Sequence, residues 1–396
     1  MRILYGVVGE GMGHATRSRV VLEHLLAAGH ELHVVVSGRA QGFLGQVFAD
    51  VSGTGPGTLD VTEIHGLHLV YDSHGVDKSE SLWSNLEQAP EGVLKNIAAY
   101  AQVVAELQPE LVISDFESWA YVYARTHDLP VISVDNMQVI NRCRHPDDVK
   151  TGRLGLPAFD FQVAKLSVKA KLPGAYHYLV SSFFFPQVRK DRTTLVSPIL
   201  RPEILAARRE PGEHVLVYQS AANNAALLPL LSRLPFPFRV YGMGTERSAD
   251  LGDNVALRPF SQDGFIDDLR TARGVVAGGG YSLMGEAAHL HVPMLAIPLR
   301  KQFEQELNAR YLARLGYGAW APDASEAAIV SFLDDLDTYA HGVSAYTPRD
   351  NSMLFGCLDE LIQRASMGEQ GPVSLDHPNL GDVVSGAIDA RLDASG

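Results

Sequence analysis

The chain contains little cysteine and little basic charge. Its 396 residues include two cysteines, Cys143 and Cys357, which lie far apart and lack the spacing of metal ligands. We therefore expect neither a disulfide framework nor a cysteine-based zinc site, and we expect a reduced, cytoplasmic setting. Lys and Arg number 33 against 46 Asp and Glu, which gives a formal net charge of −13. This balance argues against a nucleic-acid partner, because phosphate backbones are bound by clustered Lys and Arg.

Long apolar runs are also missing. No window approaches the roughly 20 consecutive apolar residues that a membrane-spanning helix needs. Residues 3–8 are apolar, but glycines and charges follow within a few positions, so they do not form the apolar segment of a secretory signal. The sequence therefore predicts no membrane span and no signal peptide, and contact with a membrane surface stays open.

Short apolar strands alternate with helical patterns in the first half of the chain. The predicted strands lie at residues 3–8, 31–38, 110–115 and 130–135. A helix is predicted between the first two strands, and it ends before Gly29. Such alternation is typical of a parallel sheet with helices on both faces.

A second series of strands and helices follows a proline-rich stretch. We predict a first domain at residues 1–197, a linker at 198–212, a second domain at 213–366 and a tail at 367–396. The predicted fold class is α/β, with two Rossmann-like parallel-sheet domains facing each other across a cleft. Sheets of this kind bind ligands at the carboxyl ends of their strands.

The first predicted strand leads into the segment GEGMGHATRS, which has glycines at positions 9, 11 and 13. A dinucleotide-binding fingerprint would need a small residue at the position of His14 and an acid at the end of the second strand. The second strand ends instead in Ser37-Gly38-Arg39. Because an arginine can accept a 2′-phosphate, a phosphorylated nicotinamide cofactor stays open as an alternative.

His14 is the candidate catalytic residue of this turn. A helix N-terminus disfavours imidazolium, and a neutral imidazole is a competent general base. Asp115 ends a predicted strand at the same sheet edge, where its carboxylate can fix the tautomer of His14 and stabilise the imidazolium formed during proton abstraction. The alternatives are structural: His14 caps the turn or fills space, and Asp115 is the N-cap of the helix that follows.

The second half contains a further glycine cluster. A predicted strand at residues 274–277 runs into three glycines, Gly278 to Gly280, and a helix begins near Tyr281. Free backbone amides at such a helix start form an anion site suited to a diphosphate. Glu286, farther along this helix, suits ribose hydroxyls. The polar side chains after the next strand suit a polyhydroxylated group, and they are Gln302, Glu304 and Gln305. This order describes a nucleotide-sugar.

The two glycine motifs resemble those of the GT-B glycosyltransferases. The second motif is similar to their signature for the sugar-nucleotide donor, at Gly280, Glu286, Pro293, Glu304-Gln305 and Asn308-Ala309. The first is similar to the Gly-x-x-Gly-His turn that opens these enzymes. Within that fold the chain resembles the group that contains the N-acetylglucosaminyltransferase of peptidoglycan synthesis and the UDP-glucuronosyltransferase-like proteins. The resemblance extends over both halves in the same order.

This resemblance implies roles for individual residues. It implies that His14 deprotonates an acceptor hydroxyl and that Asp115 orients this base. It also implies that Glu286 binds ribose and that Phe260 lies in the loop that meets the uracil ring. The implied contacts of the two glycine turns with the donor are at Gly11, Gly13, Gly279, Gly280, Tyr281, Ser282 and Leu283. The implied ligands of the transferred sugar are Gln302, Glu304 and Gln305.

The chain departs from the family at one position of the glycine turn. Plant and animal relatives have a histidine two residues before Gly280, where this chain has Gly278. Backbone amides or another residue must therefore replace one contact to the diphosphate. Arg201 and Arg258 are possible substitutes, although we expect both to be solvated charges. The acid-Gln pair is also two residues farther from the preceding proline than in plant relatives.

Together these features predict an inverting transfer of a sugar from a nucleotide-diphosphate donor, with UDP as the expected nucleotide and with no metal or cofactor. The Asp-x-Asp at Asp335 and Asp337 falls on a predicted surface helix and is expected to be solvated. Two alternatives stay open. One is an epimerase of the same fold that acts on nucleotide-sugars, and the other is a non-catalytic protein that binds them.

The acceptor is expected to lie against the N-terminal domain and to be a small molecule or a lipid. Residues 142–171 hold seven Lys or Arg against three Asp, together with apolar side chains. They form either an amphipathic basic flap that contacts an anionic lipid surface or acidic acceptor, or a solvated loop and helix. His65, His68 and His74 match no common metal site and are expected near the acceptor pocket.

Overall fold

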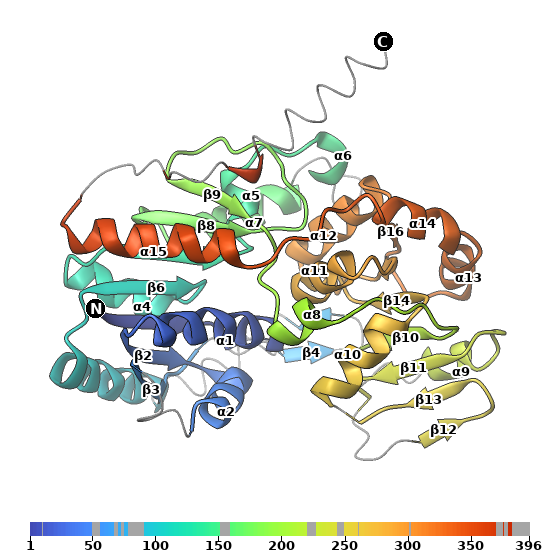
Figure 1. Ribbon diagram of the computed structural model, residues 1–396, viewed down its shortest axis with the longest axis horizontal. Coiled ribbons are helices and arrows are strands. Elements are labelled where there is room, and N and C mark those ends of the chain that lie inside the picture. The colour runs from blue at the N-terminus through green and yellow to red at the C-terminus, as the bar shows by residue number, and fades with distance from the viewer. Residues whose placement is uncertain are drawn as a thin grey trace, which may run out of the picture.

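The structure is a computed structural model of the chain (Figure 1). The residues it describes are 1–9, 11–49, 56–66, 70–72, 75–77, 91–150, 159–219, 227–243, 249–259, 261–300, 302–369, 375 and 379–381. Phe260, His68 and His74 lie outside these ranges, so the roles predicted for them stay predictions. Residues 151–158 of the predicted basic flap and most of the predicted tail also lie outside them.

The N-terminal half is built on a seven-stranded sheet in the order β3-β2-β1-β6-β7-β8-β9, in which all neighbouring strands are parallel. Its strands are β1 (Arg2–Val7), β2 (Glu31–Val36), β3 (Thr58–Glu63), β6 (Leu111–Asp115), β7 (Val131–Asp135), β8 (His177–Ser181) and β9 (Thr193–Val196). A separate antiparallel pair consists of β4 (Val70–Asp72) and β5 (Gly75–Asp77). The strands predicted from sequence correspond to β1, β2, β6 and β7.

The C-terminal half is built on a second sheet in the order β12-β13-β11-β10-β14-β15-β16, with β12 as an antiparallel edge strand and the others parallel. Its strands are β10 (Val215–Tyr218), β11 (Phe238–Tyr241), β12 (Ala249–Leu251), β13 (Val255–Leu257), β14 (Gly274–Ala277), β15 (Met294–Ala296) and β16 (Gly318–Trp320). The predicted fold class, with two parallel α/β sheets, is confirmed.

Helices cover both sheets (Figure 1). Those of the first half are α1 (Met12–Ala27), α2 (Gly38–Val47), a helix over residues 91–102 that continues into the π-helical turn η1 (Val103–Leu107), α4 (Ser118–Thr126), α5 (Val139–Arg142), α6 (Asp147–Lys150) and α7 (Phe159–Lys171). Those that follow are α8 (Pro202–Ala206), α9 (Leu227–Leu231), α10 (Gln262–Thr271), α11 (Tyr281–His289), α12 (Phe303–Arg314), α13 (Glu326–Asp334), α14 (Leu336–Val343) and α15 (Ser352–Ser366).

Strands β1, β6 and β7 of the first sheet are buried on both faces, as their near-continuous apolar sequences require. Successive side chains of a strand point to opposite faces. On β1, Ile3 and Tyr5 join a core with residues of α1, α2 and α15, whereas Leu4 joins a core with residues of α4 and α7. This second core continues into α11 and α12 of the other half.

The shared core holds the two halves together through aromatic contacts. The rings of Phe161 on α7 and Phe303 on α12 lie 5.7 Å apart in an edge-to-face arrangement. Phe184, after β8, stacks on Tyr311 of α12 at 3.8 Å. Such pairs add specific geometry to the burial of apolar surface. These contacts therefore fix the position of the first half relative to the second in this structure.

The last helix requires a correction to the predicted domain boundary. α15 places Leu354, Leu358 and neighbouring apolar residues in the core of the first sheet, although residues 213–366 were predicted to form the second domain. Figure 1 shows this red helix lying over the first half. The sequence shows only that the helix has an apolar face, not which sheet that face covers. In the predicted tail, Asn379 donates to Thr193 O of β9 at 3.1 Å.

Among the residues that the structure describes, none of the helices combines the length and the apolar character needed to cross a bilayer.

Candidate active site

Three strands of the first sheet end side by side at one edge. β1 pairs with β6 so that Val7 lies opposite Asp115, and β7 is the next strand in the sheet. The turn after β1 starts α1 at Met12 and brings His14 to this edge. Asp115 is the last residue of β6, and Asn136 directly follows β7. Open α/β sheets bind their ligands at such an edge.

The predicted contact between His14 and Asp115 is present, with His14 Nδ1 at 2.9 Å from Asp115 Oδ1. The imidazole keeps 19% of its surface exposed, whereas the carboxylate is buried. Within the described residues His14 Nε2 makes no hydrogen bond, so this nitrogen is available to a ligand. Asp115 is not the N-cap of the next helix, because Glu117 takes that place and accepts from Trp119 N and Ala120 N.

Arg17, one turn after His14 on α1, is buried against the same carboxylate. Its Nε donates to Asp115 Oδ2 at 2.8 Å, and its Nη2 donates to Oδ1. Nη2 also lies 2.6 Å from His14 Nδ1. Because a guanidinium only donates, Nδ1 either donates to Asp115 or accepts from Arg17, and the two bonds need different tautomers. The first tautomer leaves a lone pair on Nε2, which a general base needs.

The surroundings of His14 keep its imidazole neutral. Burial lowers the pKa of His14, and the cations of Arg17 and Lys171 lower it further, against the opposing effect of Asp115. Burial also disfavours the ionised form of Asp115, but Arg17 and His14 outweigh this effect and hold the pKa of the carboxyl well below its usual range. At neutral pH the site therefore contains an uncharged imidazole beside an ionised carboxylate.

The glycine turn after β14 lies against the start of α1. α11 begins directly after Gly280, and neither α1 nor α11 has a side-chain cap or an acid in its first turn. Ser282 Oγ donates to Gly13 O at 3.3 Å, so the two helix N-termini meet. Each N-terminus carries partial positive charge and unpaired amides. Their meeting point therefore favours an anion such as a diphosphate.

Atoms of α11 and α12 lie close to two of the predicted glycines. A Cβ at Gly13 would lie 2.7 Å from Ser282 Oγ, and a Cβ at Gly279 would lie 2.4 Å from a backbone oxygen of α12. A Cβ at Gly280 would meet nothing within 4 Å, so the space beside this residue is open. Gly11 has a φ of 90°, a conformation that favours glycine.

Two residues of the predicted diphosphate loop turn their side chains into the protein. The hydroxyl of Tyr281 lies 2.5 Å from Ser181 Oγ at the end of β8. Leu283 packs, partly buried, against the core shared by the two halves. The part of these two residues that suits the predicted role is therefore the backbone amide.

The polar residues predicted to hold the sugar have separate environments. Gln305 is tied to the preceding loop, since its Oε1 accepts from Leu299 N at 3.0 Å and its Nε2 donates to Gln302 Oε1 at 2.5 Å. These bonds fix the loop that leads into α12. The predicted sugar contacts of Gln302 and Gln305 stay predictions.

Glu304 instead faces the first half of the chain. Its Oε1 accepts from Asn136 Nδ2 at 2.8 Å and from Asn308 Nδ2 at 2.6 Å. Asn308 also donates to Gly279 O at 3.1 Å, which ties α12 to the glycine turn. Burial raises the pKa of Glu304 to about 7, against the opposing effects of Asn308, the Arg17 charge and Asn136.

Glu286 forms a buried ion pair that the sequence did not reveal. Its two carboxylate oxygens accept from Arg201 Nε and Nη2, each at 2.8 Å. Burial raises the pKa of Glu286, and Arg201 opposes this effect. The expectation that Arg201 is a solvated charge is wrong, because its side chain is buried in the linker against α11. The predicted ribose contact of Glu286 stays a prediction.

Three further charged residues of the sequence analysis lie in the second half of the chain. Arg258 lies 3.7 Å from Asp268. Asp335 and Asp337 are exposed where α13 ends and α14 begins. Among the described residues no group of three or more His, Cys, Asp or Glu side chains could hold a metal ion.

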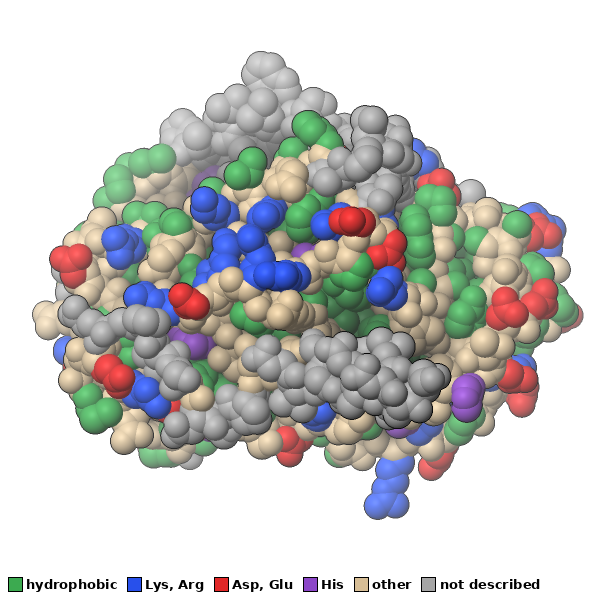
Figure 2. All heavy atoms as spheres, turned by 90° about the horizontal axis from the view of Figure 1, so that it is seen from above, with side chains coloured by type: hydrophobic (Ala, Val, Ile, Leu, Met, Phe, Trp, Pro, Cys, Tyr) green, Lys and Arg blue, Asp and Glu red, His purple; other side chains and the backbone are tan. Residues whose placement is uncertain are grey.

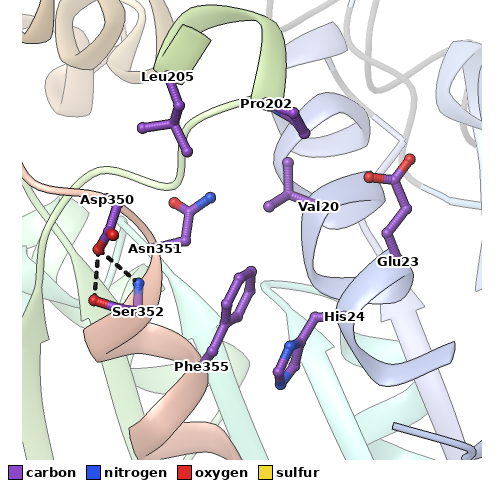
Figure 3. Close-up of a pocket in the computed structure, with 9 residues that line it drawn as sticks. All are labelled: Val20, Glu23, His24, Pro202, Leu205, Asp350, Asn351, Ser352 and Phe355. Carbon is purple, nitrogen blue, oxygen red and sulfur yellow. Dashed lines mark hydrogen bonds between the residues drawn. The ribbon is translucent and has the colours of Figure 1, made fainter. Parts of the chain in front are cut away.

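Two hollows lie outside this cluster. A pocket of about 370 Å³ lies between α1, α8 and the start of α15, where Val20, Leu205 and Phe355 converge (Figure 3). It lies beside later turns of α1 than His14. A second hollow of about 270 Å³ lies at the carboxyl ends of β2 and β3, and its lining includes Glu63, His65 and Lys95. This hollow is at the same sheet edge as His14.

Sequence reasoning missed Arg17 and Asn136. Both carry signals that could have revealed them. Arg17 is three residues after His14, and this spacing places two side chains on one face of a helix. Asn136 follows a buried strand at its carboxyl end, where parallel sheets gather their functional residues.

The fold and the site together define a GT-B glycosyltransferase. The sequence model of one family, described as Glycosyl transferase family 1, matches residues 1–337. The chain belongs to this family and is a glycosyltransferase.

Individual comparisons agree with this family. A protein of Methanosarcina acetivorans, described as an uncharacterized glycosyltransferase, is 24% identical over 339 residues, which cover 80% of this chain and 83% of that protein. The glycosyltransferase of kitacinnamycin has a TM-score of 0.62 at 17% identity and covers 92% of this chain and 98% of its own. Phytolacca americana UGT2, in complex with UDP-2-fluoro-glucose and pterostilbene, has a TM-score of 0.61 at 16% identity, with 92% and 98% covered. These solved structures establish likeness of fold.

The pair of Arg201 and Glu286 gives a stability prediction. We expect Arg201→Met to lower the free energy of unfolding in urea by about 3–5 kcal/mol, because it leaves a buried carboxylate without its partner. The double variant Arg201→Met/Glu286→Leu should recover most of this loss. The control is Arg233→Met, which breaks an exposed pair with Glu326 and should cost less than about 1 kcal/mol. An equal loss of unfolding free energy in Arg201→Met and Arg233→Met would contradict the prediction.

The charge of Arg17 gives a pH prediction. A histidine that acts as general base must be neutral, so if His14 has this role, activity should fall as pH drops through its pKa. We expect Arg17→Gln to raise this pKa and to move the acid limb of kcat/KM to higher pH, because a nearby cation is removed while Asp115 and Lys171 remain. The control Arg19→Gln removes a cation of the same helix that pairs with Glu23. If the acid limb of Arg17→Gln stays in place or moves to lower pH, the assignment of His14 as the base is contradicted.

Proposed function

We propose that the chain transfers a sugar from a UDP-sugar to an acceptor hydroxyl with inversion at the anomeric carbon and without a metal. The observation that carries this proposal is the position of His14. Its Nδ1 is held at 2.9 Å from Asp115, its Nε2 makes no hydrogen bond within the described residues, and its helix begins against the uncapped start of α11. The proposed base and the proposed anion site therefore lie next to each other, at the carboxyl ends of strands from the two sheets.

The proposed reaction is a single displacement. His14 Nε2 takes the proton of the acceptor hydroxyl as the hydroxyl oxygen forms its bond to the anomeric carbon. The bond from this carbon to the diphosphate oxygen breaks on the opposite side, and UDP leaves with the electron pair. Asp115 stabilises the imidazolium that forms. The backbone amides after Gly280 stabilise the charge that develops on the leaving diphosphate, which is the role that a metal has in other transferases.

The proposed acceptor is a lipid or another anionic molecule that approaches along α7. Phe159, Val163 and Leu166 are strongly exposed on this helix, at spacings that place them on one face. Figure 2 shows Lys and Arg side chains gathered on the surface of this side of the molecule, with hydrophobic side chains beside them. Two of the cations next to this face are Lys165 and Lys169, both on α7.

Two further cations come from the segment between β8 and β9. Burial and the surrounding cations, Arg142, Arg189, Lys169 and Lys165, lower the pKa of Lys190 to about 8. Among the described residues no carboxylate pairs with Lys165, Lys169, Arg189 or Lys190. Clustered cations beside exposed apolar side chains suit the interface of an anionic bilayer.

Replacement of His14 tests the proposed reaction. We expect His14→Ala to lower kcat by 10²–10⁴-fold in a panel of UDP-glucose, UDP-galactose, UDP-N-acetylglucosamine and dTDP-rhamnose, with lipid and small-molecule acceptors. Binding of the sugar nucleotide, measured by calorimetry, should change less than about threefold. The control His24→Ala alters a later turn of the same helix, where His24 bonds Asp359. Full turnover in His14→Ala would refute the assignment of the base.

Vesicle binding tests the proposed lipid surface. We expect the protein to sediment with phosphatidylglycerol–phosphatidylcholine vesicles more than with phosphatidylcholine alone, and Phe159→Ser/Leu166→Ser should lower this binding by about tenfold or more. The control Val93→Ser/Leu94→Ser changes two residues of similar exposure on another helix. Binding that is equal for neutral and anionic vesicles, or equally weakened by both double variants, would rule out this surface.

A further inference from the structure

A chain of hydrogen-bonded side chains crosses from the base to the second half of the protein. Arg17, which holds Asp115, donates through Nη1 to Asn136 Oδ1 at 2.5 Å. Asn136 donates through Nδ2 to Glu304 Oε1 at 2.8 Å. Glu304 accepts from Asn308 on the same oxygen. Asn136 is thus the residue through which the base cluster of the first sheet reaches the polar group of α12.

The amide of Asn136 has only one orientation that satisfies both neighbours. A guanidinium can only donate, so the amide oxygen must face Arg17. The amide nitrogen must then face Glu304, which accepts whenever its carboxyl is ionised. Asn136 is 4% exposed, so water cannot readily replace either bond. A side chain with an acceptor at one end and a hydrogen-bond donor at the other is therefore required here.

The bridge leaves one oxygen of Glu304 for another partner. Oε1 receives both amide bonds, and within the described residues Oε2 receives none. Glu304 is only partly buried, so Oε2 is not sealed inside the protein. An ionised carboxylate oxygen accepts a hydrogen bond from a hydroxyl group, and a protonated one donates to it. With its other oxygen fixed, Glu304 presents Oε2 in a set position relative to Asp115 and His14.

We infer that Asn136 is a positioning residue that fixes Glu304 against the cluster of Arg17, Asp115 and His14, so that a sugar bound by Glu304 is held in register with the base. This inference rests on the proposed function, because it assigns the Oε2 oxygen to a sugar hydroxyl. It goes further by naming the residue of the first half that sets the position of the sugar contact in the second. The proposed function assigns the diphosphate of the donor to the start of α11, and this bridge does not include the residues of that turn.

The test compares the binding of a sugar nucleotide with the binding of the nucleoside diphosphate that lacks the sugar. The probes are UDP and UDP-glucose, or dTDP and dTDP-rhamnose where the panel favours a thymidine nucleotide. We expect Asn136→Ala to weaken binding of the sugar nucleotide by about ten- to hundredfold and to leave binding of the nucleoside diphosphate within threefold of wild type. In turnover, kcat should fall together with kcat/KM, because the sugar is no longer aligned with the base.

A matched control separates positioning from general damage. Asn141→Ala removes another buried asparagine of the same segment, one that accepts from Lys190 and does not contact Glu304. It should leave the ratio of the two affinities unchanged. Thermal unfolding of both variants is measured alongside. If Asn136→Ala and Asn141→Ala weaken sugar nucleotide and nucleoside diphosphate alike, the role of Asn136 is structural and the inference is overturned.

Asn136→Asp breaks only one half of the bridge. The new carboxylate still accepts from Arg17, but when ionised it cannot donate to Glu304 and repels it. As pH falls the new carboxyl takes up a proton and donates again, so the affinity of this variant for the sugar nucleotide should rise toward that of wild type. The ionisable groups around this position are His14, Arg17, Asp115, Asp135, Tyr281 and Glu304. If the ratio of the affinities of Asn136→Asp for the sugar nucleotide and for the nucleoside diphosphate does not change with pH, the result contradicts the inference.

The result also separates this inference from the proposed function. A wild-type protein that transfers no sugar, combined with a selective loss of sugar-nucleotide binding in Asn136→Ala, supports the positioning role and rejects the proposed reaction. Normal transfer by wild type with unchanged binding and turnover in Asn136→Ala rejects the positioning role and leaves the proposed reaction standing.

Discussion

The buried ion pair of Arg17 and Asp115 is the interaction on which the candidate site depends. The two side chains are 4% and 1% exposed, so removal of either would leave an uncompensated charge inside the protein. The same carboxylate accepts from Ser18 Oγ at 2.9 Å and contacts His14. Three side chains from one face of α1 therefore meet the end of β6, and this fixes the direction of the imidazole before any ligand binds.

Much of the fold follows from the sequence, because both sheets consist of short apolar strands separated by helices with glycine stops. The contact of His14 with Asp115 was predictable for a related reason, since neighbouring parallel strands end at one edge. The glycine turn after β14 was predictable because three consecutive glycines leave the backbone amides at a helix start free of neighbouring side chains. Beside the bond from Ser282 to Gly13 there is little room, because a Cβ on residue 13 would lie 2.7 Å from the serine hydroxyl and would require that side chain to move.

The partners of buried polar groups were not predictable, because they depend on contacts between segments far apart in the sequence. Arg201 has the sequence context of a solvated linker residue, yet it pairs with Glu286, which is 85 positions away. The bridge from Asn136 to Glu304 joins residues 168 positions apart. α15 likewise has an ordinary apolar face, and only the packed structure shows that this face covers the first sheet.

The charges of the candidate site are compatible with the anionic diphosphate of the proposed donor. Asp115 is ionised but paired with Arg17. Burial raises the pKa of Asp135 to about 6 and that of Glu304 to about 7, so near neutral pH a proton on Glu304 offsets part of the negative charge. The two helix N-termini supply positive potential from the backbone without a further cation. Because this potential comes from backbone amides that are already oriented, it would cost no rearrangement as charge develops on the leaving diphosphate of the proposed reaction.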